Sequence, residues 1–232
     1  MSGPLSNLVI SGFAFLATHI LMSSTSLRGN LREPLGERGF LALYSAVAIA
    51  TFAWFAVSFA AAPAIPLWTA GRWTRLVPVF VVPVSAVLLI AGYSTRNPTA
   101  VGMERAAAAD DPAPGILRVT RHPIMWGIGL WALAHIPPNG DVAALFFFGS
   151  ITVLALGGTV LIDHKKRLAL GSNWTRLAQI TSNVPFAAIL TGRTRFRPGE
   201  IGILRFVAGL LLSAVLLLAH PLYAGGRVVL PW

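Results

Sequence analysis

The chain has 232 residues, of which 55% are hydrophobic and only 11% are charged. Soluble domains carry roughly 25% charged residues, so this composition excludes an ordinary soluble domain and indicates a chain that lies in lipid. The formal net charge of +10 comes from lysines and arginines that stand beside the apolar segments. Such a basic rim contacts lipid headgroups, so we expect a lipid bilayer and no nucleic acid as partner.

Six apolar segments are about as long as the 20 residues that a transmembrane helix needs. They lie at 4–22, 40–61, 76–93, 123–138, 141–162 and 201–223. The fourth and fifth are separated only by Pro137-Pro138-Asn139-Gly140, which predicts a tight turn between antiparallel helices. We therefore expect an all-α, polytopic membrane helix bundle with about six transmembrane helices, forming a single domain over residues 1–232.

Two shorter segments lie between these spans. Ala106 to Ala109, followed by Asp110-Asp111-Pro112, predicts a short helix that stops within the loop 94–121. Val184 to Leu190 is apolar but too short to span, which favours an interfacial or re-entrant segment.

The basic residues are distributed unequally between the two sides of a six-span bundle. The loops 23–38, 94–121 and 163–200 contain 14 of them, whereas Arg72, Arg75 and Arg227 fall on the other side. By the positive-inside rule, we expect a multi-pass protein of the bacterial inner membrane with both termini in the periplasm. Trp68, Trp73, Tyr223 and Trp232 would then anchor the outer interface.

The chain contains no cysteine, so any metal must be held by histidine, carboxylate or methionine. Placing a histidine side chain within or beside a membrane span costs free energy, so each histidine found there is a candidate functional residue. His19 and His135 lie within spans, and each is interpreted either as a packing or capping histidine or as a ligand. His164 is expected to be solvated, and His220 is expected to end the last helix.

His122 belongs to Arg121-His122-Pro123, where proline suits the first turn of a helix. It is either an interfacial cap, with Arg121 reaching lipid phosphates, or a catalytic residue. His122 and His135 are separated by about 20 Å of helix rise and a rotation of about 140°, so they cannot share one small site. Glutamates occur only in loops, so paired-carboxylate catalysis within the membrane is not expected.

Two blocks of the sequence resemble the NnrU family, which includes plant 15-cis-zeta-carotene isomerase. The first block comprises His19, the run Ser23 to Arg28, Gly36-Glu37-Arg38 and Tyr44-Ser45; the second runs from Gly115 through Arg121-His122-Pro123 and Trp131 to His135 and Asn139-Gly140-Asp141. The isomerase members are described as haem b proteins with histidine axial ligands.

The resemblance implies haem b as the cofactor. The matching metal ligands are His19 and His135, with Trp131 beside the cofactor. The isomerases are thought to change iron ligation through a cysteine one turn before the second histidine, but Ala132 occupies that position here. Bacterial members are associated with nitrite and nitric oxide metabolism in denitrification. The resemblance thus implies redox or isomerase-type chemistry, as in carotenoid biosynthesis or nitrogen-oxide metabolism.

A more distant similarity is to isoprenylcysteine carboxyl methyltransferases, which share the Arg-His-Pro helix start. Their acidic pair is replaced here by Lys165-Lys166-Arg167, so tight binding of S-adenosylmethionine is not expected.

Three functions therefore stay open. The first is a haem b-binding protein that acts on a lipophilic or small substrate. The second is a methyltransferase-like enzyme that uses Arg121 and His122 to hold a cofactor or headgroup; Arg28, Arg121 and His122 are the candidate residues for a headgroup or anionic ligand. The third is a non-catalytic assembly factor whose partners are components of respiratory nitrogen-oxide reductases.

Overall fold

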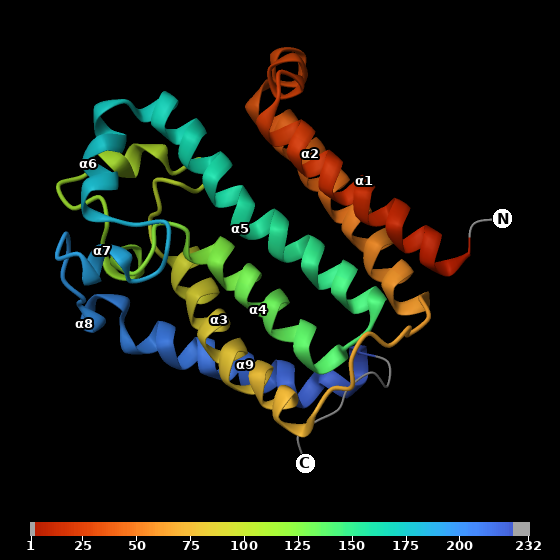
Figure 1. The fold of residues 1–232 in the computed structure, drawn as a ribbon. Helices are drawn as coiled ribbons and strands as arrows, with labels where there is room; N and C mark the ends of the chain where they lie inside the picture. The colour runs from red at the N-terminus through yellow and green to blue at the C-terminus, as the bar shows by residue number, and fades with distance from the viewer. Residues whose placement is uncertain (1–2, 225–232) are drawn as a thin grey trace.

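The computed structural model describes residues 3–224, and this part of the chain is an all-α bundle (Figure 1). Five of its helices are long and apolar enough to cross a membrane: α1, α2, α3, α5 and α9. A sixth, α4, has 17 residues and packs against α3 and α5. The expected all-α membrane architecture is confirmed, and the six expected spans correspond to these six helices.

The first two helices form a hairpin. Helix α1 spans Pro4–Ser24 and α2 spans Leu27–Ala61. The sequence predicted a loop over 23–38, but the chain is helical again from Leu27, with a kink at Gly36, whose φ of 67° favours glycine. The loop prediction was therefore wrong for most of this segment, because basic residues of a helix that extends beyond the apolar region resemble a loop in composition.

Helices α3 (Leu76–Ser94), α4 (Pro123–Asn139) and α5 (Val142–Leu170) form the middle of the bundle. The expected Pro137-Pro138-Asn139-Gly140 turn is shorter than predicted, because α4 continues through both prolines. Gly140 has a φ of 66° and ends α4, and the side chain of Asp141 accepts a hydrogen bond from the Ala144 N–H to cap α5. Helix α5 also extends eight residues past its predicted end at 162.

Helix α9 (Ile203–Tyr223) packs against α3. A side-chain carbon added at Gly209 would lie 2.7 Å from the Val87 Cα, so glycine permits the close approach of the two helices. The Arg205 guanidinium donates hydrogen bonds to the Oγ and carbonyl oxygen of Ser94 at the end of α3. The expected helix end at His220 was wrong by three residues, since α9 continues through Pro221 to Tyr223.

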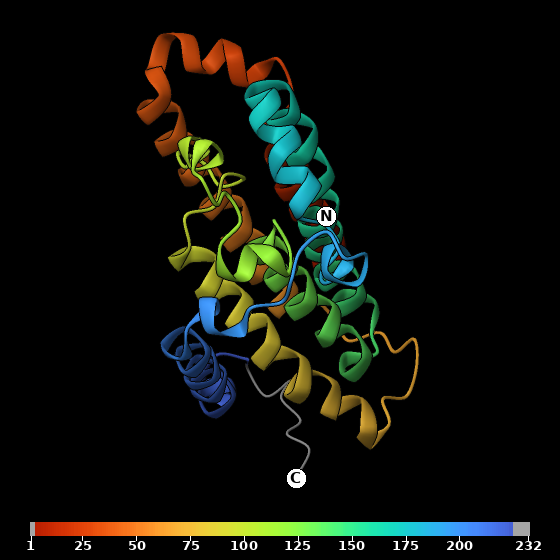
Figure 2. The same ribbon diagram turned by 90° about the vertical axis from the view of Figure 1, so that its left-hand side faces the viewer.

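Short elements gather at one end of the bundle, as Figure 1 and Figure 2 show for α6, α7 and α8. They comprise the 3₁₀ turns η2 (Glu104–Ala108) and η3 (Gly115–Arg118), and the helices α6 (Ser172–Ile180), α7 (Ala187–Leu190) and α8 (Pro198–Ile201). The expected short helix near Ala106 is thus a 3₁₀ turn, and the predicted interfacial segment contains α7.

The α2–α3 and α4–α5 connections meet at the other end of the bundle. Leu67 N–H donates to the Gly140 carbonyl oxygen, and Val142 N–H donates to that of Ile65. The 3₁₀ turn η1 (Arg72–Arg75) follows. The two sets of loops therefore lie at opposite ends, as alternation of spans requires. The orientation across the membrane stays a prediction, and Arg227 and Trp232 lie outside the described residues.

Candidate functional site

The segment before α4 is fixed by backbone hydrogen bonds to a loop that comes much later in the chain, at Ser182 to Phe186. Arg121 N–H donates to the Ser182 carbonyl oxygen at 3.0 Å, and Phe186 N–H donates to that of Val119 at 2.8 Å. Pro123 then occupies the first turn of α4, where its missing N–H leaves no helical hydrogen bond unmade. His122 therefore has a defined position at the helix start.

A carboxylate on α5 binds both predicted polar residues of this helix start. Asp163 accepts hydrogen bonds from Nε and Nη2 of Arg121, and from Nε2 of His122 at 2.6 Å. The side chains of Arg121 and Asp163 are only 13% and 14% exposed. Because a buried charge is costly without a partner, this pairing stabilises both ions and joins α4 to α5.

The hydrogen bond to Asp163 determines which nitrogen of His122 carries the proton. Burial lowers the pKa of His122 below its ordinary 6.5, so the imidazole is neutral at neutral pH. Since a carboxylate accepts, Nε2 carries the hydrogen and Nδ1 has a free lone pair. Nδ1 is buried and has no hydrogen-bond partner within residues 3–224. The arrangement therefore orients a neutral imidazole whose Nδ1 can accept a hydrogen bond or bind a metal.

Further side chains surround the ion pair. The Arg121 guanidinium carbon lies 5.3 Å from the ring centroid of Trp174 on α6. Asn183 donates to Thr159 Oγ1 at 2.9 Å and accepts from Trp126 Nε1 at 3.3 Å. Sequence reasoning missed Asp163 and these supporting residues.

A second polar cluster lies in the neighbouring loops. Arg118, whose side chain is 9% exposed, pairs with Glu200 at 2.7 Å and also with Asp111. The hydrogen bond from Arg118 lowers the pKa of Glu200 to about 2. The cluster fixes η3 against α8, so its role in the structure is to hold two loop segments together.

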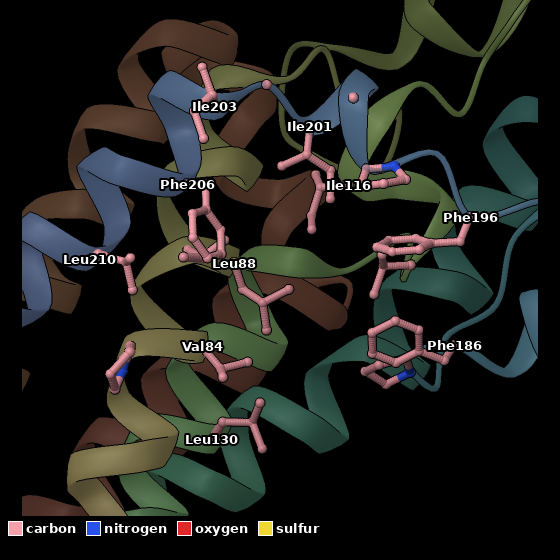
Figure 3. Close-up of a pocket in the computed structure, with 17 residues that line it drawn as sticks. Val84, Leu88, Ile116, Leu130, Phe186, Phe196, Ile201, Ile203, Phe206 and Leu210 are labelled. Carbon is pink, nitrogen blue, oxygen red and sulfur yellow. The ribbon is translucent and has the colours of Figure 1, made fainter.

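An apolar cavity of about 600 Å³ adjoins this cluster. Figure 3 shows side chains from α3, α4, α9 and the loops directed toward a common space: Val84, Leu88, Leu130, Phe186, Phe196 and Phe206. Ile116 and Ile201, next to the Arg118 and Glu200 segments, complete one end. The cavity has the size of small-molecule sites, and its lining suits a hydrocarbon.

The two predicted haem ligands lie on different helices of the bundle. Nδ1 of His19 lies 2.8 Å from the Phe15 carbonyl oxygen, and Nδ1 of His135 lies 2.6 Å from that of Trp131. Each ring can therefore donate from Nδ1 and present Nε2, the arrangement that metal-bound histidines usually have. Taken singly, each histidine fits axial ligation of an iron.

The two histidines have different ring neighbours in the bundle. The His19 ring contacts Phe15 and Tyr44, whereas the ring contacts of His135 are with Trp131, Phe148 and His220. The ring contacts lead from His135 to His19 through a series of four phenylalanines: Phe148, Phe147, Phe55 and Phe15. These ring contacts of the described residues include no neighbour that the two histidines share, and their ligation of one iron stays a prediction.

The remaining predicted residues occupy different places. Arg28 pairs with Glu37 at 3.4 Å and lies over the Phe40 ring. Arg121 and His122 do lie together, but Asp163 neutralises the arginine that was expected to bind an anion. Their role as headgroup ligands stays a prediction. His164 is exposed, as its expected solvation requires.

Comparison with known proteins extends the sequence resemblance. The chain is 32% identical over 143 residues to the chloroplastic 15-cis-zeta-carotene isomerase of Zea mays, and 31% identical to that of Arabidopsis thaliana. Each match covers 58% of this chain and 39% of the relative, so the chain matches about two fifths of the length of these relatives. No solved structure gives a significant match. The NnrU protein family model matches residues 7–228, and the chain therefore belongs to the NnrU family.

Proposed function

We propose that this membrane protein takes a long apolar substrate of the isoprenoid type from the bilayer and acts on it by isomerase-type or redox chemistry. The observation that carries the proposal is the apolar cavity between α3, α4 and α9. The distant relationship to proteins named zeta-carotene isomerase supports a polyene as the class of substrate.

The position of the cavity suits entry from lipid. Val84 and Phe206, which line it from α3 and α9, are 54% and 47% exposed, so the cavity opens at the surface of two membrane-spanning helices. A hydrocarbon chain can move from the bilayer into such an opening without crossing water. The bilayer therefore serves as the reservoir of substrate in this proposal.

The loop end of the cavity is more polar. Gly199 and Ile201 of the lining flank Glu200, and Glu200 is held by Arg118. A polyene without polar groups cannot bind to this ion pair. We therefore assign the Arg118–Glu200 pair a structural role, which is to position the wall of the cavity. An oxygenated end group would be bound here only if the pair opened.

Binding of a polyene tests the cavity directly. We would purify the protein from cells that accumulate zeta-carotene, wash it with mild detergent, and measure the retained pigment by its absorbance. Val84→Phe places bulk in the cavity, so we expect this variant to retain less pigment than the wild-type protein. Val160→Phe on α5 is the matched control, because Val160 is 63% exposed on a span and is not among the cavity residues. Equal retention by all three proteins would contradict the proposed site.

Haem b is the cofactor implied by the family resemblance, and we include it in the proposal with His19 and His135 as the predicted ligands. Haem would supply a redox-active iron to a reaction that the side chains alone cannot perform. Its support is the family relationship and the presented Nε2 atom of each histidine.

The absorbance spectrum of protein expressed with ample haem tests this cofactor. A Soret band that changes from low-spin to high-spin form, or is lost, in both His19→Ala and His135→Ala would support the predicted pair. His122→Ala should keep the spectrum. Wild-type protein without Soret absorbance would contradict the haem proposal, and a band unaffected by His19→Ala would contradict the pair.

No contact within the described residues favours the methyltransferase-like or the assembly-factor alternative over this proposal. A link to nitrogen-oxide metabolism is supported by the family relationship alone.

A further inference from the structure

A second, smaller cavity is lined by His122. It has a volume of about 330 Å³ and lies between the end of α3, the segment 97–103 and the start of α4. His122 is 1% exposed and lines this cavity, and its Nδ1 is a buried atom with no hydrogen-bond partner among the described residues. A buried polar nitrogen beside a cavity is costly unless a ligand in the cavity binds it.

The opposite side of the imidazole is arranged as in metal sites. Histidines that bind a metal through one nitrogen usually donate the other ring N–H to a carboxylate or carbonyl oxygen, which orients the ring. Here Nε2 donates to Asp163, so Nδ1 is the nitrogen left for a ligand. The lowered pKa of His122 also supports a neutral imidazole, which is the form that binds metals.

Two of the chain's four methionines line the same cavity. They are Met103, from the loop after α3, and Met125, from the first turn of α4. Of the other two, Met22 lies on α1 and does not belong to this lining. Thioether sulfurs are soft ligands that favour Cu(I) over hard cations.

The side-chain oxygen atoms of Asn97 and Thr99 in the cavity wall are already engaged in hydrogen bonds. The Asn97 side-chain oxygen accepts hydrogen bonds from the N–H and hydroxyl of Thr99, and that hydroxyl lies 2.9 Å from the Arg121 carbonyl oxygen. Residues 3–224 also contain no group of three or more histidine, cysteine, aspartate or glutamate side chains that could hold a metal. The soft donors that the cavity lining offers are the imidazole nitrogen of His122 and the two thioether sulfurs.

We propose that this cavity binds Cu(I) through Nδ1 of His122 and the thioether sulfurs of Met103 and Met125. The backbone N–H of Asn97 lies 3.5 Å from the Met103 sulfur, a weak contact that holds this side chain at the cavity and that a bound metal would replace. Asp163 acts as a positioning residue, because it fixes the orientation of the imidazole. The proposal is independent of the apolar cavity and of haem.

An anaerobic competition titration tests the proposal. Haem-free protein in mild detergent would be titrated with Cu(I) in the presence of the chromogenic chelator bicinchoninate. We expect the wild-type protein to withdraw an equimolar amount of Cu(I) from the chelator. X-ray absorption of the loaded protein should show sulfur as well as nitrogen neighbours of the copper.

Methionine variants make the test specific, because Met→Leu conserves volume and keeps the fold. The double variant Met103→Leu/Met125→Leu should lose the competition and the sulfur signal, whereas the control Met22→Leu should retain both. Asp163→Asn should weaken Cu(I) binding roughly 10- to 100-fold, as loss of a carboxylate behind a metal-bound histidine does. Folding of each variant is checked by its thermal midpoint.

Three results would overturn the proposal. The first is a wild-type protein that withdraws no Cu(I) from the chelator. The second is a folded double variant that binds Cu(I) as tightly as the wild-type protein. The third is an X-ray absorption spectrum of the copper-loaded wild-type protein that shows no sulfur neighbours, because the copper would then be bound without the methionines.

Discussion

Asp163 on α5 accepts a hydrogen bond of 2.6 Å from Nε2 of His122 at the start of α4, and the same carboxylate binds the neighbouring Arg121. One acidic side chain therefore joins two helices and sets the tautomer of a buried histidine. The carboxylate stands where a long apolar helix continues past its apolar segment, which gives it access to both partners.

Asp163→Ala should strongly destabilise the protein. It leaves the Arg121 charge nearly buried without a counterion, and breaking such a pair costs about 3–5 kcal/mol. Glu37→Ala is a suitable control, because Glu37 pairs with Arg32 at a site where the side chains are 42% and 57% exposed, and such pairs contribute about 0–1 kcal/mol. Thermal midpoints in detergent compare the two variants, and equal losses would contradict the structural role of Asp163.

The Arg118–Glu200 pair should make stability depend on pH in the acidic range. The pKa of Glu200 is about 2 in the folded protein and 4.5 for an unpaired glutamate. The pair therefore stabilises the fold above pH 4.5, and this contribution is lost as the pH falls toward 2. The difference in thermal midpoint between wild-type protein and Glu200→Gln should shrink over that interval. A difference that stays constant would show that the carboxylate does not titrate with the fold.

Gly209→Ala should weaken the packing of α9 on α3. The added methyl group would lie 2.7 Å from the Val87 Cα, and overpacking of this kind costs about 1–3 kcal/mol. Gly149→Ala is the matched control in α5, because nothing lies within 4 Å of its added carbon. Removal of a helical glycine there should be neutral or stabilising by up to about 1 kcal/mol. Thermal unfolding of both variants distinguishes the sites, and a neutral Gly209→Ala would contradict the close helix contact.

Both chain termini should lie on the periplasmic side of the membrane. The 14 basic residues of three loops on one side predict this orientation. Alkaline phosphatase fused after Trp232 should be active in bacterial cells, and a cytoplasmic reporter at the same position should be inactive. The reverse pattern would place the basic loops outside and contradict the prediction.

The sequence predicted the spans well, because hydrophobic length is a local property. All six expected segments correspond to helices, including the short α4, whose Pro123 start was recognised. The ends were less accurate. Gly140 and Asp141 end one helix and cap the next, so the prolines before them remain helical although proline usually marks a turn.

The candidate site was only half predicted. Arg121 and His122 were predicted as candidate site residues because they form an Arg-His-Pro helix start. Asp163 was missed because it lies 42 residues away from Arg121 in the sequence, beside exposed His164 and a run of basic residues. A usable signal was present, since Asp163 is a lone acidic residue directly after a long apolar segment. The contact itself depends on how α4 and α5 pack, which no local pattern gives.

The most direct test of the proposed function is the conversion of a zeta-carotene with a 15-cis double bond. Protein in lipid vesicles, supplied with haem and reductant, would be incubated with this isomer and the pigments separated by chromatography. We expect loss of the 15-cis isomer with wild-type protein and Val160→Phe, and slower loss with Val84→Phe. Pigment that is bound in the cavity but keeps its isomer composition under these conditions would contradict isomerase-type chemistry.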